Sequence, residues 1–588
     1  MRTSTILCLL PLLAPSVLAQ TCGIERVSLD ASGVEGDGAS TQASITPDGR
    51  YVVFVSAATN LVPGDTNGVA DVFVSDLRAD TIERVNLGPG GIESDASSAY
   101  PVLSDDGRFV AFHTAATNLV SGDVNGALDV FVRDRVTGTI ERVSDGPGGV
   151  QGDGPSFGAT FAGGSRYVLF VSWATNLVAL DTNAVRDVFF FDRTLGTLER
   201  VSVSSAGIEG DDMSGSGTLA SFATADGRYV FFGSMATNLV AGDTNASMDV
   251  FVRDRWTGMT SLLVSGPGGG VPNGWTDLGV VTSDGRFASF SSTAENLVQG
   301  DTNGTGDAFV LDRSSGSIDR VNVSSIGAQS PEGAGTPVLS ADGRFAVFTS
   351  AATDLAPNDW NGKRDVFRRD RAAGTTELFV PGNGIAQPQQ DVFAVSISAA
   401  GDRCAFSYAG DDLAGLDQNS VNDVLVDGCT TGSTFCSGDG TASACPCGVG
   451  DWQAGCPNAE TGGAVLDGAG RPRTNSDTLA LVVRGLPANT VVAFLFGSSK
   501  LNGGAGTVFG DGLRCVGGNI VRLATRHSAN GLATWGFGVP GAPLLSLQSG
   551  VPLGGDVRYY QAWYRNAAPF CSTATYNLTN GFEVSWLP

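Results

Sequence analysis

A short acidic pattern, Asp-x-Asn followed by a second Asp, occurs seven times in this chain. Carboxylate, amide and backbone carbonyl oxygens at this spacing could surround a calcium ion, which takes about six to eight oxygen ligands. The same side chains could instead order the loop without a metal, because Asp and Asn accept hydrogen bonds from backbone N–H groups in Asx turns. Both interpretations stay open at this stage. The seven triplets are Asp65/Asn67/Asp71, Asp123/Asn125/Asp129, Asp181/Asn183/Asp187, Asp243/Asn245/Asp249, Asp301/Asn303/Asp307, Asp359/Asn361/Asp365 and Asp417/Asn419/Asp423.

The triplets recur at a nearly constant period. Their first aspartates are separated by 58, 58, 62, 58, 58 and 58 residues, which indicates one supersecondary unit used seven times. In the unit 98–145, apolar segments at 99–103, 109–112, 129–132 and 140–144 alternate with turns that contain Asp-Gly or Thr-Gly, the chemistry of β-hairpins. The segment 109–112 is apolar at every position, so we expect a strand that is buried on both faces.

Four antiparallel strands per unit, repeated radially, predict a β-propeller. The last unit lacks a fourth strand after residues 424–426, and residues 23–28 match the fourth strand at 139–144. The fold class is therefore all-β: we expect a seven-bladed β-propeller over residues 20–429, closed by the N-terminal strand. The repeat alignment places Cys22 and Cys429 on either side of one hairpin turn, which predicts a disulfide between them. On the chain-entropy model, that bond would contribute at most about 6 kcal/mol to stability.

The N-terminus has the features of a secretory signal peptide. Arg2 precedes an apolar run at 6–14, and small residues follow up to Ala19, so residues 1–19 are expected to be removed. No later segment is apolar for long enough to cross a bilayer. We therefore expect a secreted or periplasmic protein.

Charge and histidine content exclude several classes of function. The formal charge is -25, which disfavours nucleic acid and anionic membranes and suits divalent cations or basic partners. The only histidines are His113 and His527, whereas zinc sites and Ser-His or Cys-His machinery draw on this residue. Residues 154–158 match a Gly-x-Ser-x-Gly nucleophile pattern around Ser156, but no helix is expected after it, so we interpret the match as chance.

The period stops near residue 430, where the composition changes. We expect a Cys-rich neck at 430–460 and a small C-terminal β domain at 461–588, stapled by disulfides and similar to a β-sandwich. Cys515 is a candidate partner for Cys571, and Cys404 is expected to stay unpaired on a buried strand. The remaining cysteines are expected to pair among themselves in an order that the sequence leaves open; they are Cys436, Cys445, Cys447 and Cys456.

The repeats resemble those of the TolB-like (WD40-like, PD40) β-propeller family. The resemblance is carried by Thr-Pro-Asp-Gly-Arg-Tyr-Val-Val-Phe at 46–54, Ser-Ala-Asp-Gly-Arg-Phe-Ala-Val-Phe at 340–348 and Asp-Val-Phe-Val-Arg-Asp-Arg at 129–135, and it covers residues 23–428. It implies a propeller that serves as a periplasmic scaffold, a peptide-binding module or a non-catalytic lid on a peptidase. Seven units depart from the six blades of the namesake. The tail is similar to Cys-rich C-terminal modules of exported bacterial proteins.

The triplet loops and the Gly-rich segments at 88–91, 146–149 and 266–270 are expected at the same face of a propeller. Loops on a rigid scaffold commonly carry function, so this face is the expected binding surface for a protein, peptide or glycan. We expect a non-catalytic binding or scaffold protein. One alternative is a carboxylate- or metal-dependent enzyme that acts on glycans, for which Asp211 and Asp212 in the single longer unit are the only indication. Another is a structural component of an envelope or matrix.

Overall fold

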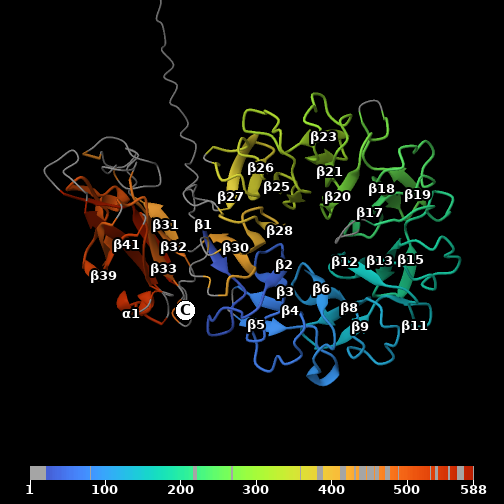
Figure 1. Cartoon of the computed structure of the whole chain (residues 1–588), viewed down its shortest axis with the longest axis horizontal. Helices are drawn as coiled ribbons and strands as arrows, with labels where there is room; N and C mark the ends of the chain where they lie inside the picture. Colours follow the sequence, from blue (N-terminus) through green and yellow to red (C-terminus); the bar gives the residue numbers. More distant parts are fainter. Residues whose placement is uncertain are drawn as a thin grey trace, which may run out of the picture.

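The computed structural model of the chain is built almost entirely of β-strands (Figure 1). Within the described residues, the helical elements are α1 (Leu545–Gln548) and the 3-10 turns η1 (Pro89–Gly91) and η2 (Leu501–Gly504), and no helix is long and apolar enough to cross a membrane. The predicted signal peptide lies outside the described residues. These are 22–586, without 78, 80, 216–220, 267–268, 358, 381–387, 411–412, 414–416, 418, 430–431, 436–444, 447–455, 457–462, 470–473, 475–476, 478, 488, 530, 537–538, 540, 554–555 and 566–574.

Seven sheets of the described chain have four antiparallel strands each, and we number them 1 to 7 along the sequence. Sheet 1 consists of β2 (Ser40–Ile45), β3 (Tyr51–Ser56), β4 (Asp71–Asp76) and β5 (Thr81–Arg84). Sheet 2 consists of β6 (Ser98–Leu103), β7 (Phe109–Thr114), β8 (Asp129–Asp134) and β9 (Ile140–Arg142). Sheet 3 consists of β12 (Ser156–Ala162), β13 (Tyr167–Ser172), β14 (Asp187–Asp192) and β15 (Thr197–Arg200). Sheet 4 consists of β16 (Ser221–Ala223), β17 (Tyr229–Ser234), β18 (Asp249–Asp254) and β19 (Met259–Leu262). Sheet 5 consists of β20 (Thr276–Val281), β21 (Phe287–Ser292), β22 (Asp307–Asp312) and β23 (Ser317–Arg320). Sheet 6 consists of β24 (Val338–Leu339), β25 (Phe345–Ser350), β26 (Asp365–Asp370) and β27 (Thr375–Val380). Sheet 7 consists of β28 (Phe393–Ile397), β29 (Cys404–Tyr408), β30 (Asp423–Cys429) and β1 (Cys22–Arg26). A small hairpin of β10 (Asp145–Gly146) and β11 (Val150–Gln151) follows sheet 2.

Consecutive sheets pack face to face through apolar side chains of their middle strands. Between sheets 1 and 2, Val53 and Val72 meet Val110 and Phe112 in one buried cluster. Figure 1 shows the sheets following one another around a common centre, from the blue strands of sheet 1 to the orange strands of sheet 7. The middle strands are buried on both faces, as their continuous apolar runs predicted.

The N-terminal strand belongs to the last sheet. β1 pairs antiparallel with β30, and Cys22 is the register partner of Cys429. Sheet 7 in turn shares a buried cluster with sheet 1, in which Ala405 and Val424 pack with Phe54. The pairing of β1 follows from the match between residues 23–28 and 139–144, whereas the Cys22–Cys429 disulfide stays a prediction.

The C-terminal part contains two sheets that share one core. Leu481 and Val483 of the smaller sheet pack against Phe494 and Tyr560 of the larger one, which is the arrangement expected of a small β-sandwich. The larger sheet has the order β31 (Gly432–Phe435), β43 (Gly581–Trp586), β41 (Asp556–Arg565), β34 (Val491–Gly497) and β39 (Val521–His527), with β42 (Tyr576–Leu578) beside β41. The smaller sheet is β32 (Val465–Ala469), β33 (Ala480–Arg484) and β40 (Ala533–Gly536), and two short hairpins join β35 (Ser499–Lys500) to β38 (Val516–Gly517) and β36 (Thr507–Phe509) to β37 (Gly512–Arg514).

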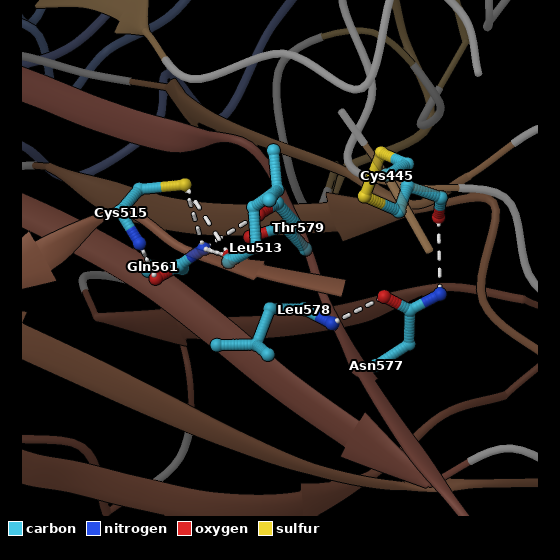
Figure 2. The surroundings of a disulfide bond; sticks show 8 residues. Cys445, Leu513, Cys515, Gln561, Asn577, Leu578 and Thr579 are labelled. Atoms are coloured by element: carbon cyan, nitrogen blue, oxygen red, sulfur yellow. Dashed lines mark hydrogen bonds between the residues drawn. A yellow bond between two sulfur atoms is a disulfide. The ribbon is translucent and has the colours of Figure 1, made fainter. Parts of the chain in front are cut away.

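A disulfide within the neck packs against this domain. Cys445 is bonded to Cys456, one of the pairings expected in the neck, and the Asn577 side chain donates a 3.0 Å hydrogen bond to the carbonyl of Cys456 (Figure 2). Cys515 is also disulfide-bonded. Its predicted partner Cys571 lies outside the described residues, as do Cys436 and Cys447. Cys404 is free and buried, as predicted, and burial raises the pKa of its thiol.

Candidate metal sites in the repeated acidic loops

The central Asn of each triplet orders its loop. In sheet 1, Asn67 Nδ2 donates to Asp71 Oδ2 at 3.0 Å and to the Ser94 carbonyl of the following inter-sheet loop at 3.1 Å. The N–H of Val69 donates to Asn67 Oδ1 at 3.2 Å, so the Asx turn is present. Side-chain bonds to the following inter-sheet loop recur at Asn125, Asn183, Asn245, Asn303, Asn361 and Asn419.

An arginine lies between the two carboxylates of the sheet 1 loop. Arg84 Nη1 is 2.9 Å from Asp65 Oδ1, 2.9 Å from Asp71 Oδ2 and 2.8 Å from Glu93 Oε1. Its nitrogen therefore occupies the place between these carboxylates that a metal ion would need. The equivalent ion pairs join Arg142 to Asp123 and Asp129, Arg200 to Asp181 and Asp187, Arg320 to Asp301 and Asp307, and Arg26 to Asp423 and Glu35.

The carboxylates of Glu35, Asp417 and Asp423 converge closely enough to hold a metal. Arg26 Nε lies 2.9 Å from Asp423 and Arg26 Nη1 lies 3.2 Å from Glu35, so this cluster already has a counter-charge. We therefore restrict the metal hypothesis to loops that lack such an arginine.

A second polar partner holds the last Asp of the triplet in these five sheets. Asn86 Nδ2 donates to Asp71 Oδ1 at 2.6 Å, which satisfies the oxygen that faces away from Arg84. Ser144, Ser202, Asn322 and Ser28 make the same bond to Asp129, Asp187, Asp307 and Asp423. The buried carboxylate is thus both neutralised and hydrogen-bonded.

Sheets 4 and 6 lack both partners. Leu262 is paired with Phe251 and Leu378 with Phe367, in the register that places Arg84 beside Phe73. The position of Asn86 is taken by a fully buried valine in each sheet, and these valines are Val264 and Val380. Both sheets therefore keep the two aspartates, but apolar residues stand at the two positions that hold the aspartates in the other five sheets.

The acids of sheet 4 are buried without a counter-charge. Asp249 is 0% exposed and Asp243 is 8% exposed, and within the described residues neither Oδ1 atom has a hydrogen-bond partner. Asn245 Nδ2 donates to Asp249 Oδ2 at 2.8 Å, so the Asp249 carboxylate is held in place but keeps its charge unbalanced. Burial raises the pKa of Asp249 to about 6.

In sheet 6, the last Asp of the triplet has a similar environment. Asp365 is 0% exposed, and neither of its carboxylate oxygens has a hydrogen bond of ordinary geometry within the described chain. Burial, together with the neighbouring Asp359 carboxylate, raises the pKa of Asp365 to about 7. The repeated Asp-x-Asn pattern alone does not reveal this division of the seven loops. A signal was available, because the arginine follows the last Asp by 13 residues in sheets 1, 2, 3 and 5.

Asp211 and Asp212 make hydrogen bonds within the protein's own loops. Although Asp211 lies in the single longer unit, it occupies a repeated position: it accepts hydrogen bonds from Thr237 N at 2.8 Å and Oγ1 at 2.9 Å, as Asp95 does from Thr117 at 2.8 Å each. Asp212 accepts from the N–H of the adjacent Met213. Asp211 thus ties two loops together.

Ser156 and His113 have structural environments. Ser156 is buried at the start of β12, and its hydroxyl donates to Ser172 Oγ at 2.8 Å, in keeping with a chance motif match. His113 is stacked on Tyr100 and lies edge-on to Phe157. Burial lowers the pKa of His113 to about 4.

One end of the sheets presents exposed apolar side chains. The start of the first strand, the end of the second and the start of the third meet there, as the register of Thr276, Ser292 and Asp307 shows. We call this the loop end, because the triplet loops and the inter-sheet loops leave the sheets there. Trp173, at 39% exposed, and Trp360, at 66%, lie in triplet loops. The inter-sheet loops contribute the exposed residues Trp275, Val34, Ile92, Val150 and Ile208.

No protein-family model matches the chain, and no curated protein matches it. The similar solved structures include the β-propeller domain of the Trilobed protease from Pyrococcus furiosus, with 10% identity and a TM-score of 0.41 over 66% of this chain and 95% of that one. A putative TolB from Agrobacterium tumefaciens has 13% identity and a TM-score of 0.30 over 50% and 86%. An oligogalacturonate lyase in complex with manganese has 11% identity and a TM-score of 0.42 over 69% and 96%. The structural neighbours of this all-β chain are thus TolB-like and other β-propeller proteins, as the repeat motifs predicted.

Proposed function

We propose that this chain is an exported, non-catalytic binding or scaffold protein whose loop end binds a protein or peptide. In this proposal the seven sheets are the blades of one propeller, and β1 closes the ring as the outer strand of the last blade. The pairing of β1 with β30 and the cluster shared by sheets 7 and 1 support the closure. The neck disulfide supports an oxidising compartment, as the predicted signal peptide does.

The observation that carries the proposal is the set of exposed apolar side chains at the loop end. Ile92, Val150 and Ile208 are each more than half exposed at one repeat position, the residue before Glu93, Gln151 and Glu209. A soluble protein rarely leaves several large apolar residues together in water unless they contact a partner. Tryptophan is among the residues that contribute most to such contacts. A repeated aliphatic position, with exposed tryptophans in loops at the same end of the sheets, suits a broad protein surface.

The chemistry of the loop acids supports binding over catalysis. Asp65 and Asp71 are held by Arg84, and Asp211 is held by Thr237. A catalytic acid or base must reach a proton of its substrate, and these groups point into the protein's own contacts.

The experiment replaces Trp173, Trp275 and Trp360 with alanine together. The matched control is Trp256→Ala, because Trp256 is 67% exposed in the turn between β18 and β19, at the opposite end of sheet 4. The wild-type chain is cross-linked in extracytoplasmic extract, its partner is identified and purified, and binding is measured by calorimetry. We expect the triple variant to lose at least about 100-fold in affinity and the control to bind as the wild type does. Equal binding by the triple variant would refute the loop end as the binding surface, and so would capture of a glycan in place of a protein.

A further inference from the structure

We propose that the acidic loops of sheets 4 and 6 each bind one calcium ion. Asp243 and Asp249 supply the carboxylates of the first site, and Asp359 and Asp365 supply those of the second. The other five loops use an arginine in place of the ion. This inference concerns stability and does not depend on the partner that the loop end binds.

The charge balance of the repeat is the first argument. In sheets 1 and 3, one guanidinium nitrogen lies within 3.1 Å of both aspartates of the triplet. Sheets 4 and 6 keep both aspartates but have leucine at the arginine position. A buried carboxylate without a counter-charge costs several kcal/mol, so Asp249 and Asp365 require a cation or a proton. The retained acids are therefore explained if a cation replaces the lost guanidinium.

The geometry of the arginine loops shows where the ion would lie. Arg84 Nη1 is 2.9 Å from one oxygen of Asp65 and 2.9 Å from one oxygen of Asp71, so two carboxylates converge on one point. Calcium–oxygen distances are about 2.3–2.6 Å, so the two carboxylate oxygens would need to lie only slightly closer to this point to bind calcium. Arg200 Nη2 also donates to the Leu180 carbonyl at 3.0 Å, which adds a third oxygen to the pocket. Gly242 is the residue at the equivalent position in sheet 4.

The ligand atoms indicate the class of cation. Two carboxylates, a backbone carbonyl and water form an all-oxygen set, which is the preference of calcium and other hard cations. Asn245 acts as a positioning residue, because its Nδ2 donates to Asp249 at 2.8 Å and to the Pro272 carbonyl at 2.8 Å. Because Leu262 and Val264 are apolar, the Asp249 Oδ1 atom has no donor among the residues that the structure describes.

The test counts ions in the full mature chain by native mass spectrometry. The protein is stripped with chelator, dialysed and returned to millimolar calcium chloride; magnesium chloride is run in parallel. We expect two calcium ions per chain. Asp249→Asn and Asp365→Asn should each remove one ion. The matched control is Asp71→Asn, the same change in an arginine-filled loop, which should leave two.

A second pair of variants introduces the arginine and asparagine of the sheet 1 loop into sheets 4 and 6 and keeps all four aspartates. Leu262→Arg with Val264→Asn should remove one ion, and Leu378→Arg with Val380→Asn should remove the other. If a restored variant fails to fold by circular dichroism, the isosteric asparagine variant decides that site. No bound ion in the wild type would show that the carboxylates share a proton and would overturn the inference. Bound ions that remain after both asparagine changes would overturn it too. Each site is tested separately by its own variants.

Discussion

Leu262 is paired with Phe251 across β19 and β18, in the register that pairs Arg84 with Phe73 across β5 and β4. Because the register is the same, the two side chains start from equivalent backbone positions beside the loop acids. The guanidinium reaches Asp65 and Asp71, whereas the leucine offers no charge. A single repeat position therefore separates five loops that contain an arginine from two that have leucine in its place.

Arg84→Leu should destabilise the protein by about 3 kcal/mol in calcium-free buffer, because it leaves buried carboxylates unpaired. The control is Arg50→Leu. Arg50 pairs with Asp76 at 2.6 Å, but its side chain is 32% exposed, and Asp76 keeps a hydrogen bond from the N–H of Ala79 at 3.0 Å. Urea denaturation monitored by circular dichroism should show a clearly larger fall for Arg84. Equal effects of the two changes would mean that the loop ion pairs contribute no more than surface pairs do.

His113 should make stability depend on pH between about 6.5 and about 4. Burial lowers its pKa to about 4 in the folded protein, whereas the unfolded chain titrates near the ordinary value of about 6.5. In this window the unfolded state binds a proton that the folded state excludes. Stability is therefore lost as the pH falls, by about 3 kcal/mol over the whole window.

His113→Val tests this assignment, because Val55 and Val171 occupy the same position in sheets 1 and 3. Unfolding free energies are measured from pH 8 to pH 4 for both proteins. As the pH falls, the wild type should lose more unfolding free energy than His113→Val does. A constant difference would show that His113 does not titrate over this range.

Cys22 and Cys429 should be joined by a disulfide, since they are register partners at the junction of β1 and β30. Proteolysis without reduction should release one peptide pair that contains both residues. Replacing both cysteines with serine should lower the free energy of unfolding by about 2–5 kcal/mol, because the bond closes a loop that spans most of the propeller. Separate peptides with free thiols would contradict the prediction.

The sequence predicted the repeated strands and their burial well, because their pattern is local. The apolar run at 109–112 became the centre of β7, and the match of residues 23–28 to a fourth strand located β1 beside β30. Periodicity and turn residues determine these features over a few positions at a time.

The division of the acidic loops was not predicted, because it depends on contacts between separate strands. Arg84 reaches Asp71 only through the register of β5 on β4, and Asn67 reaches Ser94 only because the next inter-sheet loop lies beside it. The triplets look alike in all seven units, so they suggested one interpretation for all. Comparing the units at the Arg84 position separates the two exceptions.

The most direct test of the calcium sites is thermal unfolding of the mature chain in millimolar calcium and in excess chelator. The wild type is compared with the fourfold variant Leu262→Arg, Val264→Asn, Leu378→Arg, Val380→Asn. We predict that chelation lowers the melting temperature of the wild type by several degrees, because calcium stabilises the folded state that binds it. The fourfold variant should melt at the same temperature in both buffers. A wild type that melts identically with and without calcium would contradict the account.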